Sequence, residues 1–172
     1  SERLVQLDAR LTTILKGEDK PRDVAEQVEF AQVCTLKRLH AGAARFYHEA
    51  LAAQPERKSH RFNAARAAVL TGCGKGDDAA RVDEKERARW RQQALDWLRD
   101  DLASQKEQAA ASEPKARAAA QQMLRNWLGH PDLASVRDGK GLDQLPTTER
   151  EAWRRFWNEV KTLLKTESGV SK

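Results

Sequence analysis

Apolar residues recur along most of the chain at the spacing of an amphipathic helix. Leu4, Leu7, Leu11 and Leu15 return every three or four positions, which predicts a first helix over residues 3–16. The same spacing returns in six further stretches, separated by polar or glycine-rich residues. These stretches predict two helices within 23–55, two within 59–106 and two within 112–166.

Capping patterns and glycines support these boundaries. Asp83 with Glu86, and Thr148 with Glu151, have the three-residue spacing of capping boxes at helix starts. Three glycines within Gly72–Asp77 predict a loop, because glycine loses much backbone entropy inside a helix. The order of helices and short turns therefore predicts antiparallel helical hairpins.

Composition agrees with a helical fold. The 172 residues include 27 Ala and 18 Leu but only 10 Val and Ile together. Alanine and leucine favour helices, whereas β-branched residues favour strands, so the composition favours a helical fold over a β-rich one. We expect an all-α fold of about seven helices.

The stretch 27–55 resembles a tetratricopeptide repeat, a helix–turn–helix unit of about 34 residues. The resemblance rests on small residues at helix crossings, with aromatic residues beside them and a closing proline. These residues are Phe30, Ala31, Cys34, Ala43, Tyr47, Ala50 and Pro55. Phe62–Gly72 is similar to the first helix of a second copy, whereas the hairpin in 112–166 departs from the consensus.

The repeat resemblance implies one domain, 1–172, built as a short right-handed superhelix of stacked hairpins. We expect a capping helix within 1–20 at its N-terminal end and a tail at 167–172. The ranges between them are repeat one at 23–55, repeat two with its long glycine-rich loop at 59–106, and a divergent hairpin at 112–166.

Several segments are similar to the C-terminal helical extension of bacterial serine/threonine protein kinases of the planctomycete type. They are Leu7–Leu11, Leu15–Pro21, Ala43–Tyr47, Gln93–Leu98, Pro131–Asp138 and Trp153–Leu164. The resemblance implies a non-catalytic scaffold domain excised from a larger signalling protein. The kinase motifs themselves, His-Arg-Asp and Asp-Phe-Gly, are missing from this sequence.

The repeat resemblance also points to a groove for a protein or peptide partner. By motif position, Gln32, Thr35, Asn63 and Arg66 face the concave side of such repeats. A guanidinium beside a carboxamide can hold a peptide carboxylate. An array that acts only as a rigid spacer is the other interpretation of these helices.

Charge leaves a second function open. The chain carries a net charge of +5, and residues 57–106 contribute 12 basic and 8 acidic groups. A basic surface is the usual mark of a nucleic-acid partner, although acidic residues interrupt this stretch. The candidate basic residues are Arg57, Lys58, Arg61, Arg87 and Arg91.

No pattern points to catalysis, a metal or a cofactor. The glycines of Gly72–Asp77 lack the spacing of a dinucleotide fingerprint and follow a predicted helix, not a strand. The four histidines show no zinc-ligand spacing. We therefore expect a binding protein that is not an enzyme.

The two cysteines, Cys34 and Cys73, are too few for a disulfide framework and fit a reducing compartment. The sequence has no apolar run of about 20 residues, the length that a membrane span needs. We expect a cytoplasmic chain without membrane insertion.

Overall fold

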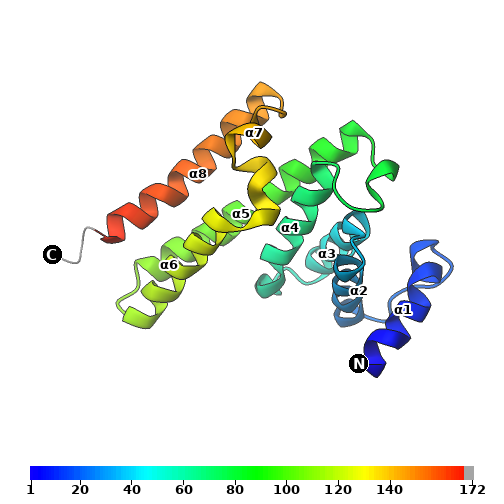
Figure 1. Cartoon of the computed structure of the whole chain (residues 1–172). Coiled ribbons are helices and arrows are strands. Elements are labelled where there is room, and N and C mark those ends of the chain that lie inside the picture. Colours follow the sequence, from blue (N-terminus) through cyan, green and yellow to red (C-terminus); the bar gives the residue numbers. More distant parts are fainter. Residues whose placement is uncertain (169–172) are drawn as a thin grey trace. The chain divides into compact units, whose positions relative to one another are not determined.

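The computed structural model describes residues 1–168, and within this range the chain forms helices and no strand (Figure 1). The α-helices are α1 (Glu2–Leu15), α2 (Val24–Leu36), α3 (His40–Ala53), α4 (Arg61–Gly72), α5 (Glu84–Ala109), α6 (Pro114–Gly129), α7 (Gly139–Leu142) and α8 (Thr147–Ser168). The 3-10 helices are η1 (Lys58–His60), η2 (Ala79–Arg81) and η3 (Pro131–Val136).

The expected all-α fold is confirmed, and the seven predicted helices correspond to α1–α6 and α8. The count of about seven misses α7, which lies where the sequence predicts a loop. A helix of four residues is too short to display a 3.6-residue period, so periodicity alone does not detect it. Of the predicted tail, 167–172, α8 takes up the first two positions, and 169–172 lie outside the described residues.

Two compact units divide the chain, Ser1–Ala94 and Leu95–Lys172, with residues up to 168 described in the second. The division falls inside α5, and so inside the stretch predicted as the second repeat, 59–106. Each unit has its own buried side chains.

Small residues form the core of the first unit. Helix α3 packs against α2 on one side and α4 on the other, and these are the most extensive helix contacts in the unit. Ala43 and Ala50, expected at a helix crossing, are buried. The rings of Phe30 and Phe46 fill the adjacent space with their centroids 5.8 Å apart. Alanines let these helices approach closely, and the aromatic rings keep the interior filled.

Gly72 allows a second close approach, between the end of α4 and the first turns of α5. A Cβ atom at Gly72 would lie 2.5 Å from Cγ of Arg91 and 3.0 Å from the carbonyl oxygen of Arg87. Neither distance leaves room for a side chain. The glycine-rich stretch is thus a packing feature at its first residue and a loop thereafter.

The loop between α4 and α5 caps α3 from a distance. No side chain of the Leu39–His40 junction caps the start of α3. Instead, the Asp78 carboxylate accepts hydrogen bonds from the backbone N–H groups of Ala41 and Gly42, at 3.1 and 2.9 Å. A carboxylate at this end of a helix satisfies unpaired donors and complements the helix dipole. The capping residue therefore lies more than 30 positions along the chain from the helix that it caps.

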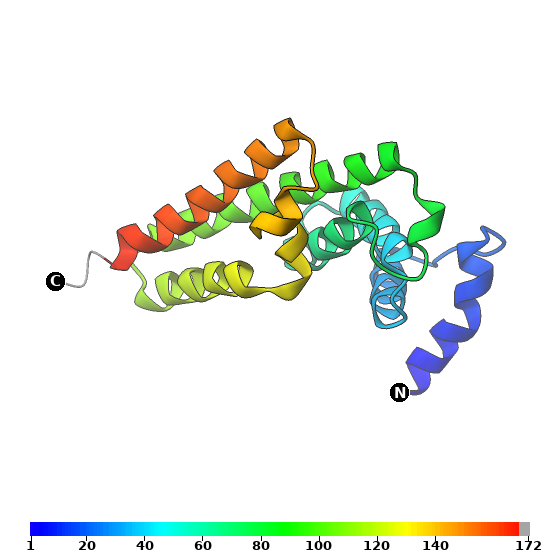
Figure 2. The same ribbon diagram turned by 45° about the horizontal axis from the view of Figure 1, so that its top comes forward.

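Aromatic residues organise the second unit. In both views α6 and α8 run beside the part of α5 that belongs to this unit (Figures 1 and 2). Trp127, Trp153, Phe156 and Trp157 are buried together between α6 and α8. The Trp157 indole N–H donates to the Val136 carbonyl at 2.8 Å, which attaches η3 to α8.

Trp97, Trp127, Trp153 and Trp157 are buried, whereas two apolar side chains at helical spacing with buried residues are exposed. Trp90 is half-buried and meets the His48 ring edge-on, with the ring centroids 5.8 Å apart. Met123 is 39% exposed, because Ala120, Leu124 and Trp127 already form the buried stripe of α6. Leu4 shares the leucine period of the first helix but is exposed as well.

We expect Asp78→Ala to lower the free energy of unfolding by about 0.5–2 kcal/mol, the range measured for loss of a helix cap. Urea denaturation followed by circular dichroism measures this. Asp77→Ala is the matched control, because the Asp77 side chain is exposed and lies 3.7 Å from Arg38 in a surface ion pair. Equal effects of the two substitutions would contradict the capping role.

Candidate functional site

The clearest candidate site is an apolar groove between α1 and α2, here called the α1–α2 groove. It has a volume of about 300 Å³ and is lined by Leu4, Val5, Val33 and Leu36, with Asp8 and Lys37 at its rim. Leu4, Val5 and Leu36 are 42%, 70% and 73% exposed. Among the described residues, Met123 is the one other large hydrophobic side chain with comparable exposure. Exposed apolar side chains gathered in one hollow mark an interaction surface.

Sequence reasoning missed this groove. The period of α1 assigns its leucines to one buried stripe, and the structure buries Leu7, Leu11 and Ile14. Val5 and Leu36 lie off the buried stripes of their helices. An apolar residue on the polar face of a helix is a detectable signal, but it does not show that two such residues come together across α1 and α2.

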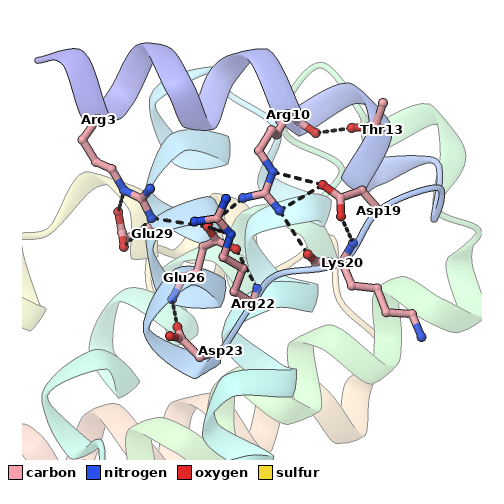
Figure 3. Close-up of polar contacts among 9 residues, drawn as sticks. All are labelled: Arg3, Arg10, Thr13, Asp19, Lys20, Arg22, Asp23, Glu26 and Glu29. Carbon is pink, nitrogen blue, oxygen red and sulfur yellow. Dashed lines mark hydrogen bonds and ion pairs between the residues drawn. The ribbon is translucent and has the colours of Figure 1, made fainter.

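A buried carboxylate holds α1, one wall of the groove, against α2. The Glu26 side chain is 3% exposed, and the Arg10 guanidinium pairs with it at 2.7 Å. The backbone N–H of Arg22 donates to the other carboxylate oxygen at 2.6 Å, and Arg3 approaches at 3.4 Å (Figure 3). A buried charge is tolerated only when it is paired and hydrogen-bonded, and Glu26 meets both conditions.

We call Glu26 and its partners, Arg3, Arg10 and Arg22, the Glu26 cluster. Further ion pairs extend from it. Arg3 pairs with Glu29 at 2.7 Å, and Arg10 also pairs with Asp19 at 2.9 Å (Figure 3). At the rim of the groove Lys37 pairs with Asp8 at 2.7 Å. These contacts join α1 to α2 and to the connection between the two helices. They fix the two walls of the groove.

The Glu26 cluster changes the acidity of its central carboxyl. Burial raises the pKa of Glu26, but hydrogen bonds from the Arg22 N–H and from Arg10, with the charges of both arginines, outweigh burial. The pKa therefore lies below its ordinary value. Glu26 is ionised at neutral pH.

The predicted peptide-groove residues lie on two helices. Asn63 and Arg66 come together on α4, where Arg66 donates to the Asn63 side-chain oxygen at 3.1 Å. Gln32 is exposed on α2, and the Thr35 hydroxyl donates to the Ala31 carbonyl of its own helix at 2.9 Å. Of the four expected residues, Asn63 and Arg66 are thus in contact with each other.

The predicted basic residues do not form one exposed patch. Arg91 is 4% exposed, donates to the Gly72 carbonyl at 2.6 Å and pairs with Glu84 at 2.8 Å. Arg87 donates to the Ala79 carbonyl at 3.0 Å. The arginines of α5 thus bind the end of α4 and the carbonyl of Ala79 in η2, which corrects the expectation of a surface that includes them.

The remaining three predicted basic residues lie around η1. Arg57 is half-buried and donates to Gln54, Lys58 is exposed, and Arg61 begins α4 with a half-buried side chain. These three residues lie close together in the sequence. The surface that they offer is therefore small for contacts with successive phosphates.

Within residues 1–168 no group of three or more His, Cys, Asp or Glu side chains is placed to hold a metal ion. Burial, followed by the nearby Asp78 charge, raises the pKa of the Cys34 thiol to about 12, so this thiol is not a nucleophile at neutral pH. None of the described helices has the length and apolar character that crossing a membrane requires.

Comparisons with protein-family models, curated proteins and solved structures find no match. The functional evidence is therefore the geometry of the surfaces described above. Of these surfaces, the α1–α2 groove is the one that combines a hollow, exposed apolar side chains and fixed walls.

We expect Glu26→Gln to lower the free energy of unfolding by about 1–3 kcal/mol at pH 7, because it removes a buried, hydrogen-bonded charge. The pKa of Glu26 is lowered in the fold, so its contribution is present above the unfolded pKa of about 4.3. That contribution is lost as the pH falls through the lower folded pKa. Urea denaturation at a series of pH values measures it.

Glu29→Gln is the control for this prediction, because Glu29 pairs with Arg3 at a position that is far more exposed than that of Glu26. Its cost at pH 7 is expected to be at most about 1 kcal/mol. A difference between wild type and Glu26→Gln that stays constant from neutral pH to pH 3 would contradict the role of the ionised carboxylate.

Proposed function

We propose that the chain is a non-catalytic protein–protein interaction domain that binds a partner through the α1–α2 groove. The observation that carries this proposal is the gathering of Leu4, Val5 and Leu36 in one hollow with exposed side chains. Burial of apolar surface contributes roughly 25 cal/mol per Å², so covering these side chains favours association.

The partner that fits the groove is an amphipathic helix. A groove whose walls are two helices takes the apolar face of a third, with anchor residues at helical spacing. The Asp8–Lys37 ion pair at the rim supplies both signs of charge beside the apolar floor. Because the Glu26 cluster already holds the walls, binding does not have to order them, and this favours affinity.

The finer architecture is part of the proposal. We infer a tetratricopeptide-like stacking of α2, α3 and α4, supported by alanines at the crossing points and by the close contacts of α3 with both neighbours. The pair Asn63 and Arg66, with Gln32 and Thr35, remains a proposed second face for a peptide. Association with a serine/threonine kinase rests on the similar sequence segments, and a cytoplasmic location rests on Cys34 and Cys73 being too few for a disulfide framework.

Nucleic-acid binding is the competing proposal, and no observation favours it. The basic stretch 57–91 would need exposed side chains, whereas Arg91 is buried and Arg87 is bonded to a backbone carbonyl. Binding of a labelled DNA duplex with a steep loss of affinity at rising salt would support it over the groove proposal.

We expect the double substitution Val5→Asp with Leu36→Asp to weaken binding of a groove partner by about tenfold or more, because two desolvated anchors become charged. Partners retained on the immobilised chain are quantified by mass spectrometry, and the affinity of each recombinant partner is then titrated. Met123→Asp is the matched control, an exposed apolar side chain in the other unit.

Circular dichroism should show unchanged helicity for both variants, because the substituted side chains are exposed. A partner that binds the double variant and wild type equally would show that it uses another surface. Concentration-dependent dimerisation abolished by the double variant would identify a second copy as the occupant, in place of a different protein.

A further inference from the structure

A second hollow lies in the first unit, where the connection between α1 and α2 passes over α3. Its volume is about 500 Å³, and it is distinct from the α1–α2 groove because the two share no lining residue. Ile14, Leu15 and Phe46 form the apolar part of its lining. We call it the α3 pocket.

Three positively charged side chains from different elements surround the α3 pocket. Lys16 follows the last turn of α1, Lys20 lies in the connection, and Arg45 lies on α3. All three are exposed, and within residues 1–168 none of their charged groups forms an ion pair or a hydrogen bond. Figure 3 shows the Lys20 side chain extending away from the Glu26 cluster.

The two acidic residues of the pocket are already engaged. Asp19 accepts from the Lys20 backbone N–H at 2.7 Å and pairs with Arg10 at 2.9 Å. These contacts lower the pKa of Asp19, the backbone hydrogen bond contributing most. Glu49 accepts a hydrogen bond from the Gln27 amide at 3.3 Å. The three cations outnumber these two carboxylates, and Arg10 compensates one of the two.

The pocket wall is held in place before any ligand arrives. Arg10 donates to the Lys20 carbonyl at 3.2 Å and to Asp19 at 3.0 Å, which fixes the connection to α1. Gly17 adopts a positive φ of 77°, a conformation that the sharp exit from α1 requires. The Arg45 guanidinium lies over the Phe46 ring, 5.3 Å from its centroid, so its position is also restrained.

We infer that the α3 pocket binds a carboxylate of a polypeptide partner, at a site separate from the α1–α2 groove. Arg45 supplies a planar guanidinium for a carboxylate, Lys20 supplies a second positive charge, and the apolar lining accepts an adjoining hydrophobic side chain. Lys16 also complements the negative end of the α1 dipole, so its charge has a structural use as well. Lys20 and Arg45 are therefore the residues that test the inference.

The experiment selects short peptides from a displayed random library on the immobilised chain. Wild type should recover peptides that combine Asp or Glu with an apolar residue. The same peptides should bind Lys20→Glu with Arg45→Glu about tenfold more weakly or worse, as expected for loss of charge-assisted hydrogen bonds. Lys75→Glu with Lys85→Glu is the control for net charge, because both lysines are exposed in the same unit and lie outside the pocket.

Synthetic copies of a selected peptide separate the two sources of the carboxylate. Loss of binding on amidation of the C-terminus identifies the terminal carboxylate, whereas loss on Glu→Gln or Asp→Asn identifies a side chain. The groove variant, Val5→Asp with Leu36→Asp, should bind the acidic peptide as wild type does. If the groove variant binds the acidic peptide as wild type does, binding at the α3 pocket does not depend on the groove. This conclusion stands whether or not the groove proposal holds.

Three results would overturn the inference. One is selection of peptides without acidic residues, and another is equal weakening by the control, Lys75→Glu with Lys85→Glu. The third is binding of a phosphorylated peptide with no binding of its carboxylate counterpart, which would assign the pocket to phosphate.

Discussion

The buried carboxylate of Glu26 is the constraint on which both candidate sites depend. It is almost without solvent contact, so positive charge has to come to it from the protein. Arg10 supplies that charge from α1 and continues to the connection that follows α1. One electrostatic requirement thus places a wall of the α1–α2 groove and a wall of the α3 pocket.

Arginines elsewhere in the chain serve a similar internal purpose, with backbone carbonyls as their targets. Arg91 donates to the carbonyl of Gly72, the last residue of α4, and Arg87 donates to the Ala79 carbonyl in η2. Arg137 and Arg150 donate to carbonyls around η3 and α7. In each case a guanidinium fixes the backbone in or beside a connection between longer helices. A positive net charge read from the sequence therefore overstates the charge available at the surface.

The helices could be predicted because their signals are local. Asp83 caps the helix for which the sequence assigns it, and its carboxylate accepts a hydrogen bond from the Glu86 backbone N–H. The contacts that shape the sites could not be predicted in this way. Asp78 caps a helix that precedes it by more than 30 residues, and Arg10 meets Glu26 across a turn. Such pairings depend on tertiary placement, which periodicity does not encode, and the α3 pocket and the exposure of Val5 and Leu36 follow from the same placement.

The burial of Cys34 has a practical consequence for following this protein in solution. Its thiol is shielded, and a Cβ added at Gly42 would lie 3.2 Å from the sulfur, so the α2–α3 hairpin closes tightly around it. Cys73 is partly accessible in the loop after α4. A thiol-reactive dye thus modifies Cys73 in the native chain and reaches Cys34 when the hairpin opens. The rate of the slower, second labelling step therefore reports local opening of the first unit, and its measurement needs no engineered probe.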